Sequence, residues 1–116
     1  MREWYTALTM ASFKNTLRRG AIRSVIFKEG DSYFGAALEL NIVEQADTPQ
    51  EAMFLLNDAV KGYVEAARKG KLSVGVLNQK IDPEYESLWS AVAAGKKTKR
   101  NVYSTSAQPI ASLSLA

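Results

Sequence analysis

The chain has 116 residues, 47% of them hydrophobic, and a formal net charge of +3. This length suits one small domain. The absence of cysteine and histidine excludes disulfides, thiolate metal sites, and the commonest general base and metal ligand. No apolar run approaches the roughly 20 residues that cross a membrane, and the N-terminus lacks the apolar segment of a signal peptide. We expect a cytoplasmic protein.

Residues 1–21 form an N-terminal extension in this interpretation. Apolar residues spaced by four favour a short helix there, although alternation over residues 4–10 also fits a strand. The spaced pairs are Trp4 with Leu8 and Phe13 with Leu17. Gly20 is placed to end such a helix.

Three strands follow in the next 25 or so residues. Residues 22–29 are rich in β-branched and aromatic side chains, which favours a first strand. Gly30-Asp31 suits a two-residue hairpin loop. Residues 33–40 and 42–46 then predict a second and a third strand. The short connections indicate an antiparallel meander.

A long amphipathic helix is predicted over residues 49–68. Thr48 fits an N-cap that accepts the amide hydrogen of Glu51, whose carboxylate reaches back to the Thr48 amide. Pro49 suits the first helical position, and Gly70 suits the C-terminal cap. One apolar stripe recurs at spacings of three and four: Ala52, Leu55, Leu56, Ala59, Val60, Tyr63 and Ala67.

Alternation at Leu72, Val74 and Val76 predicts a fourth strand. A right-handed crossover would place it parallel to the first strand, giving a sheet in the order 3-2-1-4. The expected fold is α+β with a β-β-β-α-β core. A second helix is predicted over residues 83–94, beginning at Asp82-Pro83, with an apolar stripe of Tyr85, Leu88, Trp89 and Val92.

An ordered set of motifs lies within residues 22–77. The set is Tyr33 near the start of the second strand, Glu39-Leu40, the short strand Ile42–Gln45, and Asp47-Thr48-Pro49-Gln50-Glu51-Ala52 at the helix start. In this order and spacing it resembles the HicB-type antitoxin family. The chain has Asn41-Ile42 and Ala46 where that family usually has a Pro-Gly-Cys-like turn and a glycine.

The resemblance implies a partial ribonuclease-H-like sheet and a protein that binds and neutralises a small basic RNA-cleaving toxin. Acidic side chains near the motif are candidate contacts with such a partner. They are Glu39, Glu44 and Asp47. An alternative is a stand-alone oligomeric domain of the same fold that acts as a scaffold or small-molecule binder.

Nuclease activity on such a sheet would need several carboxylates gathered at one end of the central strands to hold metal ions. Glu29 and Glu39 instead end different strands, and Asp31 lies in a turn at the opposite end from Glu44. A serine nucleophile would lack histidine as its base. The sequence therefore predicts no catalytic, metal or cofactor site and a non-enzymatic protein.

Residues 96–116 form a basic and Ser/Ala-rich tail in this interpretation. Four of its residues concentrate positive charge: Lys96, Lys97, Lys99 and Arg100. This run fits either phosphate contacts or a solvated hinge after a helix. Many HicB-type antitoxins carry a C-terminal DNA-binding domain, but this tail is too short for one. We expect weak, non-specific nucleic-acid binding at most.

Self-association is also expected. The outer strands of the sheet would be open, and apolar residues outside the core exceed what a small domain covers. They include Trp4, Tyr5, Phe13, Trp89 and the segment 110–115. We therefore predict a homo-oligomer, with the terminal arms or an open sheet edge in the interface.

Overall fold

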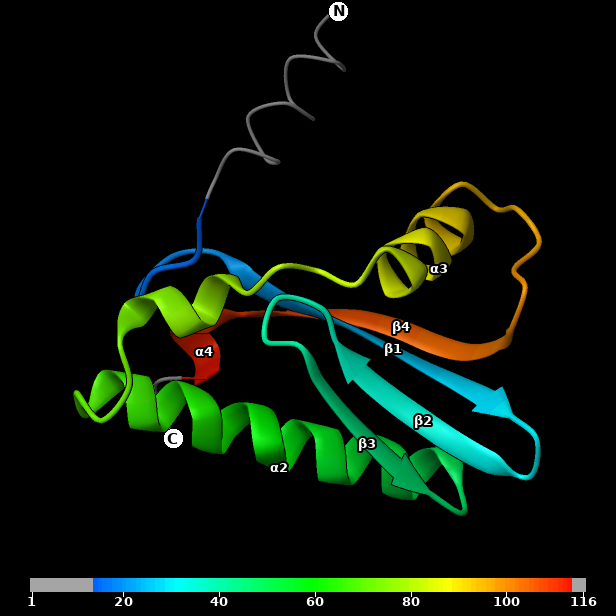
Figure 1. Ribbon diagram of the computed structural model, residues 1–116, viewed down its shortest axis with the longest axis horizontal. Helices are drawn as coiled ribbons and strands as arrows, with labels where there is room; N and C mark the ends of the chain where they lie inside the picture. Colours follow the sequence, from blue (N-terminus) through cyan, green and yellow to red (C-terminus); the bar gives the residue numbers. More distant parts are fainter. Residues whose placement is uncertain (1–13, 114–116) are drawn as a thin grey trace, which may run out of the picture.

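A computed structural model describes residues 14–113 of the chain. Four strands form one antiparallel sheet in the order β3-β2-β1-β4, with helices on both faces (Figure 1). The strands are β1 (Ala21–Glu29), β2 (Ser32–Ala37), β3 (Ile42–Ala46) and β4 (Asn101–Pro109). The helices are α2 (Pro49–Arg68), the 3₁₀ helix η1 (Val74–Asn78), α3 (Pro83–Ala93) and α4 (Ile110–Leu113). The expectations for Trp4, Tyr5 and Phe13 lie outside the described residues.

The α+β class and the sheet order are confirmed, but the predicted fourth strand is wrong. Residues 74–78 form η1, and Leu77 is fully buried in the core. The outer strand beside β1 is instead β4, from the segment interpreted as a tail, and it runs antiparallel to β1. β4 pairs along β1 from Ala21 to Lys28, which satisfies more backbone groups than the short 72–76 segment offers. The predicted parallel crossover is therefore not formed by residues 72–76.

The start of α2 follows the predicted capping with one change. The Glu51 amide donates to Thr48 Oγ1 at 3.1 Å, which confirms the N-cap. The Glu51 carboxylate accepts from the amide of Asp47 at 3.3 Å rather than from the Thr48 amide. Beyond the helix, Gly70 has a φ of 80° and provides the left-handed turn.

One face of the sheet packs on α2. Its buried cluster joins strand and helix side chains: Ile22, Ile26, Ala37, Leu40, Ala46, Ala52, Leu56, Val60, Val64, Ala67, Leu77, Ile110 and Leu113. Gly35 of β2 allows the helix to come close, because a Cβ there would lie 3.0 Å from Ile26 Cδ1 and 3.2 Å from Leu56 Cδ2. This face is therefore held almost wholly by apolar contact.

The opposite face packs on α3. Alternate residues of β1 point this way, so Val25 and Phe27 join a second cluster with Leu88 of α3. Tyr85 and Trp89 of the predicted stripe pack against it, whereas the Val92 side chain is 36% exposed. β1 is consequently buried on both faces, between α2 and α3 (Figure 1).

Candidate functional site

Arg23 of β1 is the centre of a polar network on the α3 face. Its Nε donates to Glu39 Oε2 at 2.6 Å, and its backbone amide donates to Glu39 Oε1 at 2.8 Å. Its two terminal nitrogens donate to Glu86 of α3 at 2.9 and 2.8 Å. The guanidinium also lies 5.5 Å from the centre of the Trp89 ring. The network joins β1, the turn before β3, and α3.

These contacts change the pKa values of the network. Partial burial lowers the pKa of Arg23, but its hydrogen bonds with Glu86 and Glu39 outweigh this and raise it above the ordinary value. The hydrogen bonds from Arg23 lower the pKa of Glu86. Arg23 and Glu86 are therefore held in their charged forms.

Glu39 is consequently a structural residue in this fold. Its side chain is only 15% exposed, and both carboxylate oxygens accept hydrogen bonds from Arg23. Its backbone oxygen accepts from the Gln79 amide at 2.8 Å. A carboxylate already paired and nearly buried has little left to offer a partner protein.

Glu44 and Asp47 lie elsewhere, on and just after the outer strand β3. Glu44 stands opposite Gly35, and Asp47 follows the strand and precedes the α2 cap. Within residues 14–113, neither carboxylate has a hydrogen bond or an ion pair. Beside them, the Val43 side chain is 43% exposed. We call the outer side of Ile42–Ala46, with Asp47, the β3 edge.

The four basic residues of 96–100 divide into two kinds. Arg100 forms ion pairs with Glu29 of β1 and Glu84 of α3, and its guanidinium lies 5.2 Å from the centre of the Phe27 ring. Partial burial lowers the pKa of Arg100, but the hydrogen bonds to Glu29 and Glu84 raise it above its ordinary value. The ion pairs of Arg100 therefore link α3 and the start of β4 to β1.

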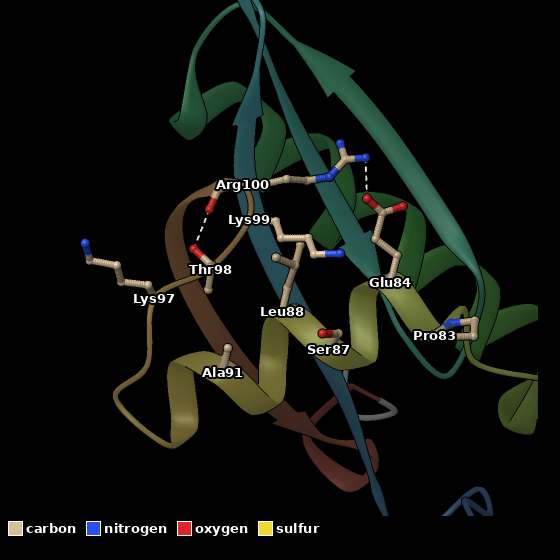
Figure 2. Close-up of a pocket in the computed structure, with 9 residues that line it drawn as sticks. All are labelled: Pro83, Glu84, Ser87, Leu88, Ala91, Lys97, Thr98, Lys99 and Arg100. Atoms are coloured by element: carbon tan, nitrogen blue, oxygen red, sulfur yellow. Dashed lines mark hydrogen bonds and ion pairs between the residues drawn. The ribbon is translucent and has the colours of Figure 1, made fainter.

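The three lysines are exposed, and two of them line a pocket between α3 and the loop before β4 (Figure 2). The pocket has a volume of about 530 Å³. Its lining comprises Pro83, Glu84, Ser87, Leu88, Ala91, Lys97, Thr98, Lys99 and Arg100. Thr98 closes the loop by donating its hydroxyl to the Arg100 carbonyl (Figure 2). The structure thus leaves Lys96, Lys97 and Lys99 for outside contacts.

Two organising residues escaped the sequence analysis. The sequence could have indicated the role of Arg23, because a charged side chain on the same strand face as Val25 and Phe27 needs ionic or hydrogen-bonding partners. Nothing in the sequence pattern indicates a structural role for Asn15. Its side chain is buried, donates to the Leu77 carbonyl at 2.9 Å and accepts from the Ala21 amide at 2.9 Å. It fixes the start of β1 against η1.

No three His, Cys, Asp or Glu side chains of the described residues gather in a way that would hold a metal ion. No helix in the described part of the chain has the length and apolar character needed to cross a membrane. Comparison with family models, curated proteins and solved structures found no match to this chain.

Proposed function

We propose that the chain is a non-enzymatic, HicB-like antitoxin of the cytoplasm that binds and neutralises a small, basic RNA-cleaving toxin. The nature of the partner comes from the sequence resemblance around Tyr33 and Asp47–Ala52. The observation that carries the binding site is the β3 edge, an open strand with two unpaired carboxylates and an exposed valine.

Three properties of the β3 edge suit a basic protein partner. The outer side of the strand offers backbone groups for strand addition. Glu44 and Asp47 provide negative charge without a partner inside the described chain. Val43 adds apolar area on the sheet face away from α2, because it pairs with Ala36 of the α3-side cluster. Glu39, tied to Arg23, is not among the proposed contacts.

Binding would neutralise the toxin by covering its active surface. Strand addition at β3 would extend the sheet without disturbing α2, because α2 packs on one face of β3 and not on its outer side. Electrostatic steering toward Glu44 and Asp47 would speed association at low ionic strength.

The test begins with the adjacent reading frames, which should include a short basic RNA-cleaving protein. Its RNA cleavage is measured with and without this chain, and its affinity is measured for Glu44→Lys. Asp58→Lys is the matched control, because Asp58 is an exposed carboxylate of α2 away from β3 and the charge change is the same.

We expect wild type and Asp58→Lys to stop RNA cleavage and Glu44→Lys to bind at least about tenfold more weakly, a loss of about 1.4 kcal/mol. Cleavage that continues in excess wild-type chain would contradict the antitoxin function. Equal weakening by Glu44→Lys and Asp58→Lys would keep an antitoxin but remove the β3 edge as its contact surface.

A further inference from the structure

The outer side of β4, which we call the β4 edge, is longer and less charged than open edge strands usually are. β4 has nine residues, Asn101–Pro109, and none of them is charged. Edge strands are commonly kept short or carry lysine to prevent pairing with another chain. The protective devices present here are a register shift opposite Ile26/Phe27 and the final Pro109. From Ser104 to Gln108 the strand is regular, mostly polar and uncharged.

Exposed apolar side chains gather around this edge. The four most exposed large apolar side chains of the described residues are Phe54 at 69%, Tyr103 at 53%, Val43 at 43% and Val92 at 36%. Tyr103 belongs to β4, and its hydroxyl accepts from Gln50 of α2 at 3.2 Å. Phe54 lies one turn beyond Gln50 on the same side of α2. Val92 of α3 lines an open groove together with Tyr103.

Tyr103 and Val92 thus lie at the β4 edge, and Phe54 lies one helical turn away from the Gln50 side chain that contacts it. Such a strand, with apolar groups beside it and no charge along it, is typical of a strand that pairs with another. We infer that β4 pairs antiparallel with β4 of a second copy of this chain, joining two four-stranded sheets into one.

A second copy fits this edge for reasons of symmetry and charge. A two-fold axis brings the same strand opposite itself, so each uncharged residue of β4 meets another uncharged residue. The exposed lysines of 96–99 lie at one end of β4 only. Antiparallel pairing places the two basic segments at opposite ends of a nine-residue strand, about 30 Å apart. Parallel pairing would bring them together.

This pairing forms a closed dimer with no further β4 edge left to pair. It uses both β4 edges and leaves the two β3 edges outermost, which are short and carry Glu44. The assembly therefore stops at a dimer and does not grow by the same contact. This inference stands on β4 alone and does not depend on the partner proposed for β3.

The experiment compares the mass in solution of wild type, Ser106→Lys and Ser106→Glu across a range of micromolar concentrations, with the full chain. Ser106 is exposed near the middle of β4, so a two-fold pair would bring two like charges close to the axis. Gln45→Lys places the same charge on β3 as a control. Circular dichroism of each variant checks that the fold is kept.

Wild type and Gln45→Lys should be dimers, and each Ser106 variant should dissociate at least about tenfold more readily. Mixing folded Ser106→Lys with folded Ser106→Glu should restore a dimer through opposite charges, which a purely structural effect would not do. A wild type that stays monomeric, even if another protein then protects β4, would overturn the inference. So would a dimer that Gln45→Lys dissociates or that both Ser106 variants leave intact.

Discussion

The two edges of one sheet differ in length, charge and support. β3 has five residues, carries Glu44 and is followed by Asp47, whereas β4 has nine residues and no charge. Both leave a row of backbone groups open, so chain geometry alone does not distinguish their partners. Their charges distinguish the partners, because an acidic edge repels its own copy and attracts a basic protein, while an uncharged edge can pair with itself.

The two edges are also held by different forces. β3 packs on α2 through apolar residues such as Ile42 and Ala46. β4 is held by backbone hydrogen bonds to β1. At its start, the Arg100 ion pairs also link it to β1 and to α3. The first support depends on burial of apolar area, and the second depends in part on charge.

The largest effect is expected at the apolar support of β3. Leu56 is 1% exposed, in contact distance of the β2 backbone at Gly35. Leu56→Ala should lower the free energy of unfolding by about 3 kcal/mol, because it leaves a cavity under β2 and β3. Asp58→Ala, two residues away on the exposed side, should change it by less than about 0.5 kcal/mol. Denaturant unfolding measures both, and equal losses would break the contrast.

A smaller loss is expected at the polar network. Arg23→Met keeps apolar bulk on β1 but leaves the nearly buried Glu39 with only the backbone amide of residue 23. The free energy of unfolding should fall by about 2 kcal/mol. Arg18→Met, at an exposed arginine before β1, is the matched control and should be close to neutral. If Arg23→Met proved as neutral as Arg18→Met, the network would not support the α3 face.

The element boundaries show which parts of the fold a sequence pattern predicts. The helix over residues 49–68, the Gly30-Asp31 hairpin loop and the helix from Pro83 follow from local signals: caps, turn residues and a period of 3.6. These features depend on neighbours in the chain, so one sequence suffices to predict them.

The fourth strand could not be predicted in this way. Residues 72–76 alternate more clearly than residues 101–109, yet the latter pair with β1. The choice between two candidate strands depends on packing, because Leu77 enters the α2-side core while Val102 enters the α3-side cluster. Of the predicted contact residues, Asp47 is exposed and Glu44 is half-buried but unpaired, whereas Glu39 and Arg100 form ion pairs inside the fold.

The network should also make stability depend on pH. The pKa of Glu86 is lower in the folded chain because Arg23 donates to its carboxylate. Its stabilising contribution is therefore complete above the ordinary glutamate range and is lost as the pH falls through the lowered value. The difference in unfolding free energy between wild type and Glu86→Gln should shrink as the pH falls through that range. A difference that stays constant with pH would contradict the assigned role of Glu86.

The smallest effect is expected from nucleic acid. Arg100 is paired with Glu29 and Glu84, so three exposed lysines remain near the start of β4. Random DNA and the promoter DNA of this chain's own gene should bind with a Kd above about 1 µM at physiological salt. The logarithm of the binding constant should fall with the logarithm of the salt concentration with a slope no steeper than about −3. Lys99→Gln should weaken this binding further. Sub-micromolar, sequence-selective binding would show that the β4 end is a nucleic-acid site.

Amide hydrogen exchange of the two edge strands, read residue by residue, tests the difference between them most directly. Outward-facing amides of Val102–Gln108 should exchange slowly at high protein concentration and faster on dilution, as a dimer dissociates. Outward-facing amides of β3 should exchange quickly at every concentration and slow down only when the basic partner is added. Fast exchange of β4 at all concentrations, or protection of β3 that rises with the concentration of the chain alone, would contradict this difference between the edges.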